Sequence, residues 1–296
     1  MKRTLLIAAL AAISSLQPVS AFAWGFTGHR LIMRRAIDLL PADLKPFFTH
    51  YREEVVIRAI DPDLWRNVGW EDDPNHFLDF GAREYGAYPF RELPREYGAA
   101  LERFGMATLK RNGLLPWRVA ELFGNLRRGF EGFAREGAYA PNDVVLFAPV
   151  VGHYIQDAHQ PLHATINYDG QLTGNHGIRS RFEGDLVERF ESRLTIAPAP
   201  PTAIRNARDA AFDALLSGYP LVDQILKADK ESVAAKEVYD DDYFEKFFVK
   251  VRPILEQRLS ESITATAGMI IGAWEAAGKP ALELEGARPP QKVRKP

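Results

Sequence analysis

The chain of 296 residues contains no cysteine. Disulfide bonds and thiolate ligands are therefore excluded, and a bound metal ion would have to use histidine, carboxylate or backbone groups. Basic charge is not in excess either, because 37 Lys and Arg residues face 39 Asp and Glu residues. This net charge of −2 does not indicate a polybasic surface for nucleic acid. Bound divalent cations reverse the sign of charge locally, so net charge alone leaves the substrate open.

The sequence also lacks sustained β-type alternation, internal repeats and heptad arrays. Apolar residues instead recur at helical spacing along most of the chain, and an apolar content of 46% is ordinary for a globular protein. We therefore predict an all-α fold, with many helices in a single domain. The spacing indicates helices over residues 28–40, 42–60, 94–109, 116–133, 144–158, 179–194, 203–217, 220–231 and 240–277. Residues 61–63 indicate a turn, 81–98 an irregular excursion and 165–177 a polar loop.

The first 23 residues have the composition of a secretory leader. Lys2 and Arg3 precede an apolar run at 5–13, which is too short to cross a bilayer, and Ala21-Phe22-Ala23 matches a signal-peptidase site. An uncleaved membrane anchor is the alternative. Cleavage after Ala23 predicts an exported protein, periplasmic or secreted, that begins at Trp24.

The mature chain is expected to form one domain over residues 24–278. A Pro- and Lys-rich stretch at 279–296 indicates a flexible C-terminal tail. Loss of the two basic residues of the leader changes the formal net charge to −4, because 35 basic residues then face 39 acidic ones.

The stretch GHYIQDAHQPLHA, residues 152–164, gathers several metal-ligand side chains. His153 and Asp157 are four residues apart and share one face of a helix, about 6 Å apart along its axis. His163 follows shortly after Pro161, which is expected to end that helix. Two imidazoles and a carboxylate without sulfur favour a first-row metal such as zinc. A core histidine beside a capped helix end is the alternative interpretation.

Other polar groups stand where helices are expected to begin or end. The chain has seven histidines, and four of them join this set of candidate ligands. The set consists of the Trp24 terminus, His29, Asp61 or Asp63, His76, His153, Asp157 and His163.

With these residues in order, the chain resembles the superfamily of bacterial zinc-dependent phospholipases C and single-strand-specific zinc nucleases. The resemblance covers most of the mature chain and is strongest in AWGFTGHRLI, DPDLWR, NHFLDF and GHYIQDAHQPLHA. It implies an all-helical fold with a cluster of two or three zinc ions in a cleft. The ordered set of motifs carries the resemblance, since each motif alone is weak.

The resemblance also implies which residues hold each zinc ion. One ion would be held by Asp63, His76, His153 and Asp157, with Asp61 as the alternative to Asp63. A second would be held by His29, by bridging Asp157, and by the α-amine and carbonyl oxygen of Trp24. A third would be held by His163 with a histidine and a carboxylate spaced four residues apart.

The sequence departs from the superfamily at this third position. Arg179 stands four residues before Glu183, where the superfamily has a histidine, and a guanidinium cannot ligate a metal. His176 lies nearby but is seven residues from Glu183, too far along a helix, about 10.5 Å, to share an ion. Three interpretations stay open: His176 substitutes as a ligand, Arg179 supplies fixed charge beside a zinc pair, or Arg179 simply pairs with Glu183.

These features predict hydrolysis of phosphodiesters by a zinc-activated water. Asp157 would bridge two ions, Asp63 or Asp61 would position the water, and Arg179 would stabilise charge on the phosphate. Asp79 is a candidate to orient a ligand imidazole, whereas His159 matches no ligand.

Two substrate classes stay open: phospholipid, which is slightly favoured, and single-stranded nucleic acid. Phe80, Tyr88 and Tyr168 are candidates for stacking on a base, although core or loop packing is the favoured role for each. The excursion at 81–98 is a candidate for transient contact with a membrane surface. An exported zinc-binding protein without catalysis is the third alternative, and no feature demands a protein partner.

Overall fold

A computed structural model describes residues 24–135, 137, 139–233 and 238–284. The described part is a single all-α domain of many helices, which confirms the predicted fold class. An isolated parallel β-bridge joins Phe80 to Thr165. The expected leader, 1–23, and most of the expected tail, 285–296, lie outside the described residues.

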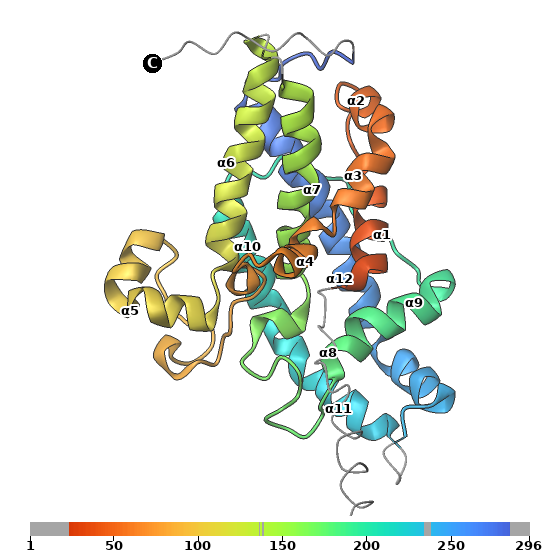
Figure 1. Ribbon diagram of the computed structural model, residues 1–296. Coiled ribbons are helices and arrows are strands. Elements are labelled where there is room, and N and C mark those ends of the chain that lie inside the picture. Colours follow the sequence, from red (N-terminus) through yellow and green to blue (C-terminus); the bar gives the residue numbers. More distant parts are fainter. Residues whose placement is uncertain (1–23, 136, 138, 234–237, 285–296) are drawn as a thin grey trace, which may run out of the picture.

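The principal helices follow one another along the chain with short 3₁₀ or π turns between some of them (Figure 1). They are α1 (Gly25–Asp38), α2 (Lys45–His50), α3 (Arg52–Arg58), α4 (Asp61–Trp65), α5 (Tyr97–Asn112), α6 (Leu115–Ala134), α7 (Ala140–Ala158), α8 (Ile178–Ser180), α9 (Leu186–Phe190), α10 (Ala207–Gly218), α11 (Val222–Ser232) and α12 (Asp241–Ala276). The shorter turns are η1 (Arg66–Val68), η2 (Asp73–Asn75), η3 (Arg83–Tyr85), η4 (Pro161–Ala164), η5 (Arg181–Asp185), η6 (Glu191–Arg193) and η7 (Tyr219–Leu221).

Helix α7 occupies the centre of the domain. It packs against α6, α12, α3, α10 and α1, and Figure 1 shows α6 and α7 upright beside each other with α12 behind them. Residues 148–158 of α7 are all buried. A helix that is apolar nearly all round can satisfy its whole surface only in such a position, as its sequence predicts.

Gly152 lets two other helices approach α7 closely. A Cβ atom at this position would lie 2.4 Å from Met33 Cε of α1 and 3.3 Å from Thr266 Cγ2 of α12. The next residue along the chain is His153. Close packing therefore fixes the backbone of α7 at the point where the predicted metal ligands begin.

Three local predictions need correction. The helix expected over 42–60 is interrupted at Tyr51 and forms α2 and α3. The turn expected at 61–63 is instead the first turn of the short helix α4. The helix expected over 179–194 widens into a π turn at Arg181–Asp185 between α8 and α9. Apolar spacing misses such breaks because it measures burial, which continues through them.

The part of the chain that the structure describes contains no helix with the length and apolar character needed to cross a membrane.

Candidate metal centre

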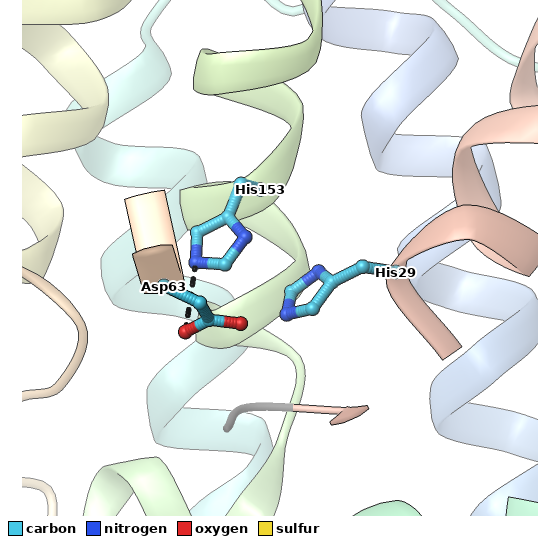
Figure 2. A group of neighbouring side chains, drawn as sticks. All are labelled: His29, Asp63 and His153. Carbon is cyan, nitrogen blue, oxygen red and sulfur yellow. Dashed lines mark ion pairs between the residues drawn. The ribbon is translucent and has the colours of Figure 1, made fainter. Parts of the chain in front are cut away.

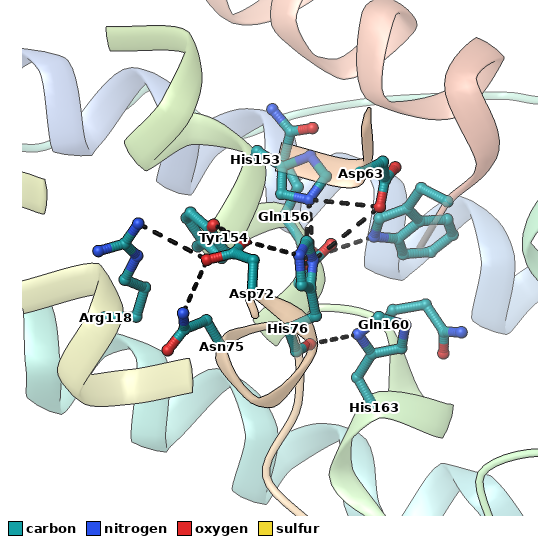
Figure 3. Close-up of polar contacts among 12 residues, drawn as sticks. Asp63, Asp72, Asn75, His76, Arg118, His153, Tyr154, Gln156, Gln160 and His163 are labelled. Atoms are coloured by element: carbon teal, nitrogen blue, oxygen red, sulfur yellow. Dashed lines mark hydrogen bonds and ion pairs between the residues drawn. The ribbon is translucent and has the colours of Figure 1, made fainter. Parts of the chain in front are cut away.

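The side chains of the candidate centre come from four segments that meet at the C-terminal half of α7. His153 and Asp157 lie one turn apart on α7, while His29 comes from α1 and Asp63 from α4 (Figure 2). His76 follows the turn η2, which places it against α7 (Figure 3). Packing of α1, α3 and α4 onto α7 therefore assembles a polar group inside an apolar core.

One group of donor atoms combines two imidazoles with two carboxylates. His76 Nδ1 lies 2.9 Å from Asp157 Oδ2 and 4.0 Å from Asp63 Oδ1. His153 Nε2 lies 3.3 Å from Asp157 Oδ2 and 3.8 Å from Asp63 Oδ1. The two imidazole nitrogens are 3.1 Å apart. This is the set of four residues that the resemblance assigns to one ion.

A second group lies on the other side of Asp157. Its Oδ1 atom is 3.4 Å from His29 Nε2, and the His29 ring stacks on the His153 ring with centroids 4.0 Å apart. His29, Asp63 and His153 also place donor atoms within 4.8 Å of one another. The two oxygens of Asp157 thus face different histidines, as a carboxylate does when it bridges two ions.

Three imidazoles are held with the Nε2 lone pair directed at carboxylates. The Nδ1–H of His29 donates to Gln156 Oε1 at 2.6 Å, that of His153 to the Ala59 carbonyl at 2.8 Å, and that of His163 to the His76 carbonyl at 2.6 Å. A histidine whose Nδ1 donates to oxygen carries its lone pair on Nε2. These hydrogen bonds select the tautomer that a metal needs.

The spacing of these atoms fits a tetrahedral ion. Ligand atoms about 2.0–2.1 Å from zinc stand about 3.3 Å apart at the tetrahedral angle. The four His–carboxylate distances of the first group, 2.9–4.0 Å, lie on both sides of this value, and the His29–Asp157 distance of 3.4 Å is close to it. Within the described residues, His29 Nε2 and Asp157 Oδ1 are buried and have no hydrogen-bond partner. Buried lone pairs that face each other without a proton between them are satisfied by a cation.

Asp72 orients His76 from the opposite side of the ring. Its Oδ2 atom accepts from His76 Nε2 at 3.1 Å and from the Tyr154 hydroxyl, while its Oδ1 atom accepts from Asn75 Nδ2 at 2.8 Å. Arg118 adds an ion pair at 3.7 Å (Figure 3). Burial opposes ionisation of Asp72, but these hydrogen bonds prevail and lower its pKa to about 2. Asp72 therefore carries a negative charge behind His76, and that charge would make His76 a stronger ligand for a metal ion.

The buried histidines and carboxylates shift one another's pKa values. Burial favours the neutral form of Asp157, but His153 and His76 outweigh it and hold the Asp157 pKa well below its usual range. Burial likewise lowers the His76 pKa, but hydrogen bonds to Asp157 and Asp72 raise it to about 10. Burial and the neighbouring His153 keep the His29 pKa well below its ordinary value. The centre therefore pairs ionised carboxylates with positive charge, which a metal ion supplies in place of protons.

The third predicted position contains His163, Glu183 and Arg179. His163 Nε2 lies 3.6 Å from Glu183 Oε2, and Arg179 Nε donates to both Glu183 oxygens at 3.2 and 3.4 Å. Gln160 Nε2 donates to Glu183 Oε2 at 2.5 Å. His176 is exposed on the loop before α8, and its backbone oxygen accepts from Arg181. The structure therefore brings Arg179 to Glu183 and leaves His176 at the surface.

Trp24 is buried at the start of α1, close to the other predicted ligands. Its indole Nε1 donates to the Gln156 carbonyl at 2.8 Å, and its carbonyl oxygen accepts from Gly28 at 3.1 Å. Gly25 adopts φ 57°, and a Cβ there would lie 3.3 Å from Gly184 Cα, so α1 begins against the π turn that carries Glu183. The residue expected to become the N-terminus is thus anchored between the second and third positions.

The structure separates several alternatives that the sequence leaves open. Asp63 lies in the centre, whereas the Asp61 side chain is 28% exposed and pairs with Arg58 at 3.6 Å. Asp79 is buried, and burial raises its pKa to about 7 against the opposing charge of Arg179. The carboxylate that accepts a hydrogen bond from His76 is that of Asp72, not that of Asp79. His159 donates to the Ile155 carbonyl at 2.8 Å and is outside the centre.

Sequence reasoning missed three residues that hold the ligands in place: Asp72, Gln156 and Gln160. The four-residue spacing of Asp72 and His76 was a visible signal for the first of them. The amide side chains gave no such signal because their partners are distant in sequence.

In comparisons with known proteins, no protein-family model and no curated protein matches the chain. Buried His and Asp groups of this chain are arranged so that they could hold a metal ion.

Proposed function

We propose that this chain is an exported zinc-dependent hydrolase of phosphoric diesters. The observation that carries the proposal is the position of Asp157, whose Oδ2 faces His76 and His153 while its Oδ1 faces His29. A carboxylate bridging two metal ions about 3.5–4 Å apart is typical of phosphoester hydrolases.

In this proposal each ion has its own histidines. Asp63, His76, His153 and Asp157 would hold the first, and His29, Asp157 and the main chain of Trp24 would hold the second. Zinc at these positions supplies Lewis acidity, which lowers the pKa of a water molecule and neutralises charge on the phosphoryl oxygens.

The chain's own residues fix the arrangement and bind the substrate. Gln156 accepts a hydrogen bond from His29, the Ala59 carbonyl accepts one from His153, and Asp72 accepts one from His76. These bonds keep the other nitrogen of each ring turned toward the proposed metal ions. Arg179 lies beside the centre on α8, and a guanidinium offers donors in a fork that matches phosphate oxygens. Hydrolysis transfers the diester phosphorus from its alcohol to water, and the departing oxygen takes up a proton.

A phospholipid is the proposed substrate class. Large apolar side chains are exposed in the segments that flank the ligands: Trp70 and Val68 lie between Asp63 and His76, and Leu172 lies in the loop after His163. Apolar side chains that are exposed together can make transient contact with a lipid surface. Trp70 is 61% exposed and packs against Trp65.

Single-stranded nucleic acid is the second candidate substrate, because exposed aromatic rings can stack on bases. Tyr88 and Tyr168 are exposed and available for this role. Phe80 is buried and stacks on Phe90 with centroids 4.5 Å apart, so it is a core residue.

The test uses the purified mature chain that begins at Trp24. Zinc content is measured first, and turnover of bis(p-nitrophenyl) phosphate is then followed during zinc removal and restoration. Turnover that follows the zinc content supports the proposal. Activity that survives complete chelation would overturn it, and bound zinc without turnover on any diester would favour a zinc-binding protein without catalysis. Parallel assays on phosphatidylcholine vesicles and single-stranded DNA then separate the two substrate classes.

A further inference from the structure

Glu183 at the third position is already satisfied by groups of the chain. It accepts from Arg179 Nε with both oxygens, at 3.2 and 3.4 Å, and from Gln160 Nε2 at 2.5 Å. Gln160 is itself fixed, because its Oε1 accepts from the Leu162 amide at 2.5 Å. Glu183 is 1% exposed, so its charge is balanced locally by the guanidinium.

The number of donor atoms at this position is small. His163 Nε2 and a Glu183 oxygen face each other across 3.6 Å, and Arg179 occupies the place four residues before Glu183 on the same helical face. Catalytic zinc sites generally use three protein ligands, and a guanidinium provides none. Neither His163 nor Glu183 belongs to a group of three or more potential ligands among the residues that the structure describes.

The charge at this position opposes a metal ion as well. Arg179 is only 15% exposed in its side chain, so its positive charge is poorly screened by water. A dication bound to Glu183 would share that carboxylate with a guanidinium at hydrogen-bond distance, and like charges at this range repel.

We infer that Arg179 replaces the third metal ion, so that this chain binds a pair of ions and uses the guanidinium of Arg179 as the third positive charge facing the substrate phosphate. This inference rests on the proposed function, since it assumes that the pair binds. Arg179 donates its Nε to Glu183 and so places its positive charge at the third position. The charge at the third position thus belongs to the polypeptide and cannot be removed by a chelator.

The Arg179→His variant tests the metal count. It places an imidazole four residues before Glu183 and so gives the third position two nitrogens and a carboxylate. We expect two zinc equivalents in the wild-type chain and three in Arg179→His. The matched control is Arg179→Gln, which removes the charge without adding a ligand that suits zinc, and is expected to bind two.

A second substitution shows where the added ion binds. His163→Ala in the wild-type background is expected to leave two equivalents, whereas His163→Ala combined with Arg179→His is expected to return the count from three to two. Thermal unfolding of each variant identifies any that fails to fold. If only Arg179→His fails to fold, the wild-type count and the His163→Ala count still decide the inference.

Inorganic phosphate serves as the probe for the guanidinium. Its affinity for the zinc-loaded chain is expected to fall about tenfold or more in Arg179→Gln and less in Arg179→Lys, which retains the charge without the fork. Three zinc equivalents in the wild-type chain, one of them lost in His163→Ala, would overturn the inference while leaving the proposed function intact. Two equivalents with phosphate affinity unchanged in Arg179→Gln would also overturn it. Fewer than two equivalents in the wild-type chain would instead overturn the proposed function and the inference built on it.

Discussion

Asp157 Oδ1 lies 3.4 Å from His29 Nε2, although the two residues are separated by 128 positions and belong to different helices. The other oxygen of Asp157 is engaged by His76 at 2.9 Å. One carboxylate therefore links the N-terminal helix α1 and the segment after α4 to the central helix α7.

Asp157→Asn is expected to abolish tight binding of both ions. An amide keeps the size of the side chain but removes the charge and one acceptor oxygen, so the bridge is lost. Loss of groups that only orient metal ligands costs about 10–100-fold in affinity or activity, and loss of the bridging ligand is expected to exceed about 100-fold in kcat/KM. Zinc analysis and turnover of bis(p-nitrophenyl) phosphate measure both effects. A variant that retains two ions and normal kcat/KM would exclude the bridging role.

Asp72→Asn is expected to weaken the first ion without removing a ligand. The negative charge behind His76 disappears, and zinc affinity is expected to fall about 10–100-fold. Competition with a chromophoric chelator measures the affinity. Asp61→Asn is the matched control, because the same change at a partly exposed, Arg58-paired carboxylate is expected to leave zinc affinity unchanged. Equal losses of zinc affinity in the two variants would contradict the orienting role of Asp72. They would also contradict the choice of Asp63, rather than Asp61, as the ligand.

One residue added before Trp24 is expected to remove an ion. In the chain that begins at Trp24, a free α-amine has an ordinary pKa of about 7.7–8, and a metal ion can displace its proton near neutral pH. In an extended chain this nitrogen is part of a peptide bond and cannot ligate. Zinc content is expected to fall by one equivalent and activity with it. Circular dichroism and thermal unfolding of the extended chain serve as the folding control, and equal kinetics for both chains would rule out the terminal ligand.

Trp70→Ala is expected to impair large substrates selectively. Trp70 is exposed in the segment between Asp63 and His76 and lies outside the hydrophobic core, so its removal is expected to leave the fold intact. Loss of the exposed ring is expected to raise KM for phosphatidylcholine vesicles severalfold. Turnover of bis(p-nitrophenyl) phosphate is expected to remain close to wild type, because this substrate is too small to use the exposed ring. Tyr139→Ala is the control, since Tyr139 is exposed at the N-terminus of α7, about 20 Å along the helix axis from His153. A selective rise in KM for single-stranded DNA, with vesicles unaffected, would favour the nuclease reading.

His159→Asn is expected to reduce the acid sensitivity of the metal-free chain. Burial and the charge of Arg258 lower the His159 pKa to about 3 from its ordinary value near 6.5. The unfolded chain therefore takes up a proton as the pH falls through about 6.5, whereas the folded chain resists until about 3, and the free energy of unfolding decreases across this window. Asn retains a donor near the position of Nδ1 and does not titrate. Urea unfolding at several pH values from 7 to 3.5 is expected to show a shallower decline in the variant, and parallel declines would contradict this prediction.

Local sequence patterns predicted the parts of the centre that one helix contains. His153 and Asp157 are one turn apart on a helix whose apolar surface required burial, so their shared face followed from periodicity alone. The assignments of His29 and Asp63 came instead from resemblance, because no local pattern relates residues of α1 and α4 to α7. Burial of the helices was predictable, but which side chains meet across them depends on packing.

The residues that were missed show the same limit. Gln156 contacts His29 and Trp24 at sequence separations of 127 and 132, and an amide side chain carries no signature of that role. Asp72 and Asp73 are adjacent and chemically identical, and the backbone of the turn η2 decides which one faces His76. The break at Tyr51 likewise left the apolar spacing unchanged, so the periodicity predicted one helix where the chain forms two.

Gln156 accepts hydrogen bonds from two residues of the N-terminal segment, Trp24 and His29. Its carbonyl oxygen accepts from the Trp24 indole, and its side-chain oxygen accepts from His29. Neither bond uses a metal ion, so the terminus is docked on α7 by the polypeptide itself. The main chain of Trp24 is therefore held in position without a metal ion, so the proposed second ion would meet a coordination sphere that is already arranged.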